Sequence, residues 1–96
     1  MIRKAKIKDI KEIQGLINYF AKQDIMLPRS LNELYENIRD FWVWEEKGKV
    51  SGCAAMHISW DDLAEIKSLA VAKRLHNKGV GKELVTACLL EAGELG

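Results

Sequence analysis

The sequence predicts an α/β fold with the element order β-α-α-β-β-β-α and a mixed, mainly antiparallel sheet. Apolar residues recur at helical spacing near both ends of the chain, and two extended apolar runs in the middle flank the turn residues Lys47-Gly48. A third run leads through a polar segment into a glycine-rich helix start. With 96 residues, 48% of them hydrophobic, the chain has the size of a single globular domain, residues 1–96.

The first two predicted elements are a short strand and a helix. Ile2–Ile7 alternates apolar residues with lysines, which predicts a strand. Asp9 is the expected N-cap of the helix, with Glu12 three residues later as the reciprocal partner of a capping box. The apolar face of this helix consists of Ile10, Ile13, Ile17 and Phe20.

A second helix follows the sole proline of the chain. Pro28 disfavours a helical conformation at Leu27. Ser30 and Glu33 then form another expected capping box, which predicts that the helix begins there. Its apolar face consists of Leu31, Leu34 and Ile38.

The rest of the chain predicts a meander and a final helix. Phe41–Glu46 and Val50–Trp60 are the two strands of a hairpin, and Ala64–Ala72 is a third extended run. Gly79–Leu95 returns to helical spacing. The apolar face expected for this helix consists of Leu84, Val85, Cys88, Leu89, Ala92 and Leu95.

The composition excludes several classes of partner. Lys and Arg number 15 and Asp and Glu 14, so there is no charge imbalance of the kind that favours nucleic acid. No stretch approaches the roughly 18 apolar residues of a membrane span, and the N-terminus lacks a signal-peptide core. We therefore expect a cytoplasmic protein that binds neither nucleic acid nor membranes.

The two cysteines do not indicate a metal or redox site. Cys53 and Cys88 both lie in apolar stretches and lack the paired spacing of metal ligands. We expect both to be reduced thiols in the core, and we predict no metal site.

The segment Arg74–Leu84 carries the clearest chemical signal. It follows the extended run Ile66–Val71 and contains Gly79-Val80-Gly81 where a helix begins. Glycine lets a backbone approach a phosphate closely, and the free N–H groups and dipole of a helix start favour an anion. Lys78 and Lys82 add positive charge. The segment is therefore predicted to bind a pyrophosphate.

Two nucleotide-binding motifs do not fit this segment. The dinucleotide motif G-x-G-x-x-G needs a third glycine, where this chain has Glu83 or Leu84. The P-loop needs Ser or Thr after Gly-Lys and a glycine five residues before its second glycine, and neither is present around Gly81-Lys82. A nucleotide-binding protein is therefore the weakest of the functional alternatives.

Several motifs resemble those of one acetyltransferase superfamily. AEIKSLAV at 64–71 and HNKGVG at 76–81 resemble the central strand and the acetyl-CoA loop, Q/R-x-x-G-x-G/A, of the GNAT superfamily. LPRS at 27–30 and SGCAA at 51–55 are similar to the N-acetylglutamate-synthase-like enzymes of arginine biosynthesis. The resemblance implies a GNAT-like fold that transfers acetyl from acetyl-CoA to a small-molecule primary amine, such as that of glutamate. His76 and Asn77 depart from the Gln or Arg and the Gly usual in this loop, although Asn tolerates a left-handed backbone.

The resemblance also implies which residues bind acetyl-CoA. Backbone groups of Leu69, Ala70 and Val71 would pair with the pantetheine arm and the thioester. The pyrophosphate would be bound by the amides of His76, Asn77, Lys78, Gly79, Val80, Gly81 and Lys82. The alternative is that the two glycines only shape a turn between a strand and a helix.

Three further residues are candidates for the acceptor side. Glu65 corresponds to a glutamate that acts as general base in the histone-acetylating branch, since an ammonium must lose a proton before it attacks. Glu65 and Lys67 share one face of an ideal strand about 6.6 Å apart, so a cross-strand ion pair on a solvated face is the alternative role. Arg29, with Lys67 beside it, is suited to bind an amino-acid carboxylate. Solvated surface charges are the alternative for both.

The family resemblance has a consequence for the central strand. GNAT domains continue beyond this helix, whereas the chain stops at Glu94-Leu95-Gly96. Ile66–Val71 would then be an unpaired edge, so we expect a homo-oligomer through this strand, with a fragment or a poorly active truncated product as alternatives. The competing function is a non-catalytic acyl-CoA-binding or dimerisation module derived from a GNAT fold.

Overall fold

The computed structural model describes residues 1–24, 26, 28–61 and 63–95. The conformation expected for Leu27 lies outside these residues. The helices and strands are β1 (Ile2–Lys4), α1 (Ile10–Ala21), α2 (Leu31–Glu36), β2 (Phe41–Glu46), β3 (Lys49–Trp60), β4 (Leu63–Val71) and α3 (Val80–Leu95). The predicted order β-α-α-β-β-β-α is confirmed.

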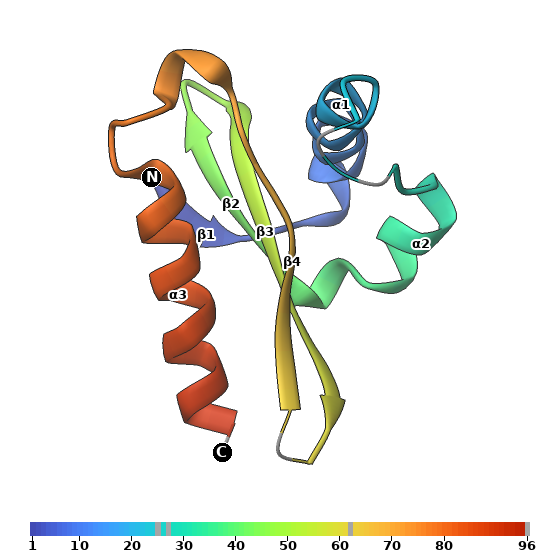
Figure 1. Cartoon of the computed structure of the whole chain (residues 1–96), viewed down its shortest axis with the longest axis vertical. Coiled ribbons are helices and arrows are strands. Elements are labelled where there is room, and N and C mark those ends of the chain that lie inside the picture. The colour runs from blue at the N-terminus through green and yellow to red at the C-terminus, as the bar shows by residue number, and fades with distance from the viewer. Residues whose placement is uncertain (25, 27, 62, 96) are drawn as a thin grey trace.

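The four strands form one antiparallel sheet in the order β1-β2-β3-β4. The sheet lies between α1 and α2 on one side and α3 on the other, and the β3–β4 hairpin extends toward the C-terminal end of α3 (Figure 1). Each face has its own buried cluster. The cluster under α1 and α2 contains Ile10, Ile13, Ile17, Phe20, Leu34, Phe41, Val43, Val50, Cys53, Ala55 and Ala70. The cluster under α3 contains Ala54, Met56, Val71, Leu75, Val80, Leu84 and Cys88.

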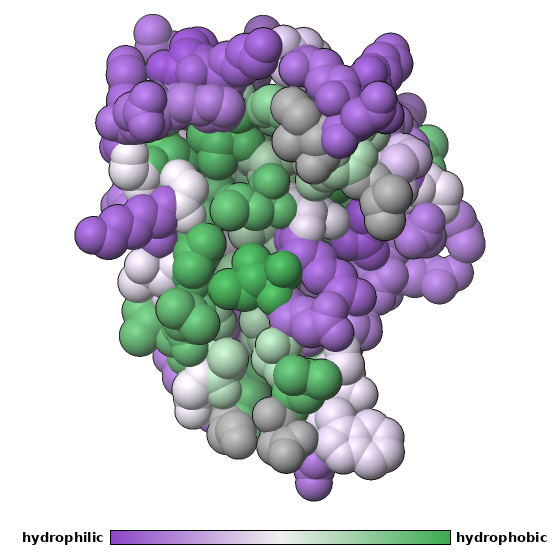
Figure 2. Space-filling view, in the orientation of Figure 1, coloured by the Kyte–Doolittle hydropathy of each residue, from purple (hydrophilic) through white to green (hydrophobic). Residues whose placement is uncertain are grey.

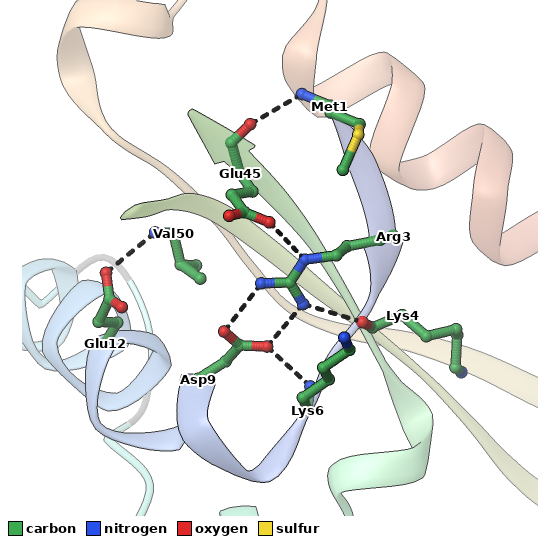
Figure 3. A network of polar contacts seen from close by, with 8 residues as sticks. All are labelled: Met1, Arg3, Lys4, Lys6, Asp9, Glu12, Glu45 and Val50. Carbon is green, nitrogen blue, oxygen red and sulfur yellow. Dashed lines mark hydrogen bonds and ion pairs between the residues drawn. The ribbon is translucent and has the colours of Figure 1, made fainter. Parts of the chain in front are cut away.

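The predicted capping box of α1 is wrong. The Asp9 carboxylate accepts hydrogen bonds from Arg3 Nη1 at 2.7 Å and Nη2 at 3.0 Å, and from the Lys6 backbone N–H at 2.7 Å (Figure 3). Glu12 Oε2 instead accepts from the Val50 N–H at 2.9 Å. A two-point contact with a guanidinium is stronger than a neutral cap, so the tertiary pair replaces the local motif.

The same interaction shortens the first strand. β1 ends at Lys4 rather than Ile7, and Ile7–Asp9 forms a 3₁₀ turn in which Ile7 is exposed. This turn brings Asp9 back beside the strand. Arg3 Nε also donates to Glu45 Oε1 on β2 at 2.6 Å, so one guanidinium joins β1, β2 and the start of α1.

The capping box of α2 is confirmed. The Ser30 hydroxyl accepts from the Glu33 N–H at 3.2 Å, and Leu34 is fully buried. The helix ends at Glu36, and the chain enters β2 through the 3₁₀ turn Ile38–Asp40. α2 therefore sets where the preceding loop, with Arg29, lies against the sheet.

α3 packs on the sheet through a narrower face than the sequence predicts. Val80, Leu84 and Cys88 are buried at a spacing of four residues. Leu89 and Leu95 were expected in this face, but they are 61% and 62% exposed. Leu89 lies outside the buried stripe, whereas Leu95 lies in line with it but in the last turn of the helix. Among the described residues, no helix is long and apolar enough to span a lipid bilayer.

Candidate functional site

A β-bulge interrupts β4. Cys53 pairs with Ala70 and Ala55 with Lys67, so β4 has one more residue than β3 between these pairs. Ser68 lies at the extra position with φ +55°, in the left-handed region that non-glycine residues seldom adopt. Neighbouring side chains of a regular strand point to opposite faces, whereas here Lys67 and Ser68 line the same cavity.

The loop after β4 makes a tight turn into α3. Asn77 has φ +65° and Gly79 φ +83°, so the left-handed conformation that Asn tolerates is present. The helical ladder starts with the bond from Glu83 N–H to the Gly79 carbonyl at 3.0 Å. The amides of residues 80–82 precede this bond and have no acceptor within the helix. They form the open start of α3.

These elements enclose a cavity of about 570 Å³. Its lining includes every residue predicted to bind acetyl-CoA except Lys78, namely Leu69, Ala70, Val71, His76, Asn77, Gly79, Val80, Gly81 and Lys82. Phe20, Met26 and Leu75 complete it. Phe20 and Met26 were missed in the sequence, because they reach the cavity only through the packing of α1 and the loop that follows it, whereas Leu75 belongs to the 3₁₀ turn Lys73–Leu75 after β4.

In the structure, fewer backbone amides are free to bind a pyrophosphate than the sequence predicts. The amides of His76 and Lys78 donate to the carbonyls of Lys73 and Leu75, at 3.1 and 3.3 Å. The His76 side chain connects the loop to β4, since Nε2 lies 2.7 Å from the Val71 carbonyl oxygen, and its ring stacks on Phe20. His76 therefore fixes the shape of the loop.

The two glycines of the loop differ in what the fold requires. Gly79 has a positive φ, which an L side chain adopts only with strain. Gly81 lies in the helix, and a Cβ there would meet only Val71 Cγ2, at the ordinary distance of 3.9 Å. The fold alone thus has no need of glycine at 81, where alanine favours a helix by about 1 kcal/mol. The open space faces the cavity that Gly81 lines.

A second cavity, of about 440 Å³, adjoins the first. It brings together Arg29 and Lys67, with Met26, Pro28, Glu33 and Ser68 in the rest of its lining. Met26 lines both cavities, and the consecutive residues Ser68 and Leu69 line one each. The bulge is therefore the point where the two cavities meet.

Glu65 does not line either cavity. Its Oε2 lies 3.8 Å from Lys67 Nζ, its Oε1 accepts from the Ser59 hydroxyl at 3.3 Å, and nearly half of its side chain is exposed. The alternative expected for Glu65 was a cross-strand ion pair, whereas the ion pair in the structure joins it to Lys67 of the same strand. Among the described parts of the chain, no group of three or more His, Cys, Asp or Glu side chains is arranged to hold a metal ion.

Comparison with known proteins identifies the family. Residues 7–96 match the model of the acetyltransferase (GNAT) family. The chain belongs to the GNAT family. This GNAT chain is 37% identical over 98 residues to an amino-acid acetyltransferase of Mycobacterium tuberculosis, a match that covers 99% of the chain and 56% of the relative. It is 43% identical over 84 residues to an N-acetyltransferase of Chlorobaculum tepidum, covering 88% and 54%. The chain thus spans little more than half the length of these relatives.

Solved structures confirm the predicted GNAT fold. A Mycobacterium tuberculosis protein crystallised in complex with CoA superposes on 99% of the GNAT chain and on 58% of its own, with a TM-score of 0.93 and 37% identity. An N-acetylglutamate synthase of Neisseria gonorrhoeae, in complex with coenzyme A and N-acetyl-glutamate, has a TM-score of 0.93 and 34% identity over 100% of the chain and 23% of its own. The expected likeness to N-acetylglutamate synthases is also confirmed.

Proposed function

We propose that the chain forms the donor-binding part of an N-acetyltransferase that moves an acetyl group from acetyl-CoA to the amine of an amino acid such as glutamate. Membership in the GNAT family and the likeness to amino-acid acetyltransferases support this proposal. The observation that carries it is the cavity between β4 and the start of α3, where Gly81 leaves space that the fold itself does not need.

On the donor side, most contacts come from the backbone. The exposed edge of Leu69–Val71 would pair with the pantetheine arm as a further strand would. The pyrophosphate would meet the free amides at the start of α3, with Asn77 beside them and the Lys82 side chain supplying positive charge. His76, Lys78 and Gly79 would maintain the turn that presents these amides.

On the acceptor side, Arg29 and Lys67 would bind a carboxylate of the amino acid. Glu65 is the proposed base, which takes a proton from the ammonium directly or through a water. The amine then attacks the thioester carbon, the C–N bond forms, and the C–S bond breaks as CoA leaves as a thiolate. Replacing Glu65 by Gln should lower kcat most at neutral pH, where most of the amine is protonated, and a flat rate loss across pH would contradict its role as base.

The proposal is tested by the effect of CoA on thermal unfolding. A ligand that binds only the folded chain raises its Tm, so millimolar CoA or acetyl-CoA should do so. Gly81→Ala should unfold at the same or a higher temperature than the wild type without CoA, and should lose most of the shift with CoA. Gly93→Ala is the matched control, since Gly93 lies in the same helix and a Cβ there meets no atom within 4 Å.

The outcomes separate the proposal from its alternatives. No Tm shift in the wild type, or an equal shift in Gly81→Ala, would contradict the donor site. A shift without release of free CoA thiol, over a panel of amino acids, would favour a non-catalytic acyl-CoA-binding module.

We also propose that two copies of the chain associate through β4, the last strand of the sheet. An antiparallel pair centred on Ile66 would place Glu65 of one copy opposite Lys67 of the other, twice, so the charges are complementary. Ile66 and Leu69 on this edge are partly exposed, and an apolar patch extends over part of β4 and the adjoining side of α3 (Figure 2). A monomeric mass by light scattering at high concentration would contradict this association.

The proposed location is the cytoplasm. Cys53 and Cys88 are both free and buried, which fits a reducing compartment. Recovery of the native protein with the membrane or secreted fraction of cells would contradict this location.

A further inference from the structure

Ser68 is fixed at the meeting point of the two cavities by contacts from two other elements. Its hydroxyl accepts a hydrogen bond from Arg29 Nη1 at 2.9 Å, and its carbonyl accepts one from Cys53 Sγ at 3.4 Å. A left-handed backbone at a serine is strained and persists only where its surroundings impose it. The position of this hydroxyl is therefore set by the tertiary structure.

The Arg29 side chain is in turn restrained on three sides. Besides the bond to Ser68, its guanidinium lies 5.5 Å from the centre of the Phe41 ring, and Nε lies 3.9 Å from Glu33 Oε2. Only 16% of the side chain is exposed. Within residues 1–24, 26, 28–61 and 63–95, Nη2 has no hydrogen-bond partner. Arg29 lines the same cavity as Lys67.

We propose that Ser68 is a positioning residue for the acceptor. Its hydroxyl holds the Arg29 guanidinium so that Nη2 and the Lys67 ammonium together meet one carboxylate. The inference rests on the proposed transfer to an amino acid, and it adds a residue that makes the site selective for an acid over the matching amide. A guanidinium that is already oriented loses less conformational freedom when the ligand binds. Two cations also attract a carboxylate more strongly than the uncharged amide.

The bulge explains why this arrangement needs Ser68 in particular. In a regular strand the residue after Lys67 would point to the opposite face of the sheet. The extra residue in β4 turns the hydroxyl to the same cavity as Lys67 and directs Leu69 to the donor cavity. The acceptor cations and the donor wall are thereby placed by one short segment.

The test compares the binding of two probes to the full chain saturated with CoA. L-glutamate and its α-carboxamide are titrated into ¹⁵N-labelled wild type and Ser68→Ala, and NMR gives the dissociation constants. Wild type should prefer the acid. Ser68→Ala should lose about tenfold of that preference, as expected for one lost hydrogen bond to a charged group, while its affinity for CoA stays within about twofold. The Arg29 Nε–Hε resonance should shift in Ser68→Ala before any probe is added.

Two more variants separate the hydroxyl from general effects on the fold. Ser68→Gly removes the hydroxyl and relieves the left-handed strain, so it should lose the preference while remaining as stable as Ser68→Ala or more so. Ser51→Ala removes another serine hydroxyl that accepts from an arginine, Arg74 Nη2, also at 2.9 Å, but outside both cavities. It should keep the full preference for the acid.

Each outcome decides the inference. A Ser68→Ala variant with the wild-type preference would overturn the role of Ser68 and leave the proposed acceptor class standing. An equal loss of the preference for the acid in Ser51→Ala would also overturn this role, because the effect would then come from a general change in the fold. A wild type that binds CoA but does not prefer the acid would overturn the proposed acceptor and this inference together.

Discussion

Cys53 on β3 supports the candidate site by its contact with Ser68, although it lines neither cavity. Burial raises the pKa of its thiol to about 12, so at neutral pH the thiol keeps its proton and donates it to the Ser68 carbonyl. Because only the thiolate reacts, iodoacetamide at about pH 8 should modify Cys53 in the folded chain roughly a thousand times more slowly than in denaturant. Mass spectrometry of the Cys53 peptide measures this ratio, and equal rates in both states would contradict it.

Sequence reasoning succeeds at residues whose conformation is decided locally. Asn77 and Gly79 have the positive φ that these two residue types tolerate, within a motif recognisable over six residues. Ser68 was missed because its conformation depends on Arg29 and Cys53, which are distant in sequence. The one local signal was the adjacent polar pair Lys67-Ser68 within an apolar strand, which breaks the expected alternation.

At the level of elements, the ion pair of Arg3 with Asp9 predicts how the stability of the chain depends on pH. The hydrogen bonds from the Arg3 guanidinium hold the pKa of the Asp9 carboxyl below its usual value. The stabilisation is therefore complete above the ordinary carboxyl pKa of about 4, and it is lost as the pH falls through the lowered value. Asp9→Asn should lower the free energy of unfolding near neutral pH by about 2 kcal/mol and reduce the acid sensitivity.

Chemical denaturation at several pH values checks this prediction. The matched control is Glu46→Gln, which removes a carboxylate from a more exposed pair with Arg74. Exposed pairs contribute little, so this variant should unfold almost as the wild type does. An Asp9→Asn variant with the acid profile of the wild type would contradict the role assigned to the Arg3 pair.

The errors in predicting elements share one physical cause. Ser30 and Glu33 form their capping box although Arg29 Nε lies 3.9 Å from Glu33 Oε2, whereas the much closer Arg3 guanidinium takes the Asp9 carboxylate. The apolar pattern of α3 likewise could not show which leucines face the sheet. A Cβ at Gly52 would meet Leu84 Cδ1 at 3.2 Å, so α3 lies close to the sheet at Gly52, a tertiary contact that the apolar pattern of the helix does not show.

For the whole molecule, the donor site and the proposed association through β4 use the same edge. Leu69 lines the donor cavity and lies on the strand that would pair with a second copy. CoA should therefore shift the chain toward the monomer, which sedimentation at increasing CoA concentration measures. Unchanged association at saturating CoA would contradict a shared edge.

Charge reversal tests the register of this pair. Glu65→Lys places like charges opposite each other and should weaken association. The double variant Glu65→Lys with Lys67→Glu restores complementary charges and should restore it. If the double variant does not recover the association, the pairing centred on Ile66 is excluded.

The bulge in β4 also bears on how the specificity of such a domain can diverge. In the proposed donor site the contacts would come from backbone groups of residues 69–71 and the start of α3, so most side-chain substitutions should leave them intact. The acceptor cavity is made of side chains, among them Arg29, Lys67 and Ser68. If the proposed function holds, point substitutions in this cavity can exchange the amine that is acetylated while the acetyl donor stays the same. An insertion or deletion between residues 67 and 71 would displace one half of the proposed site against the other. A change in the length of this segment should therefore do more damage than a substitution within it.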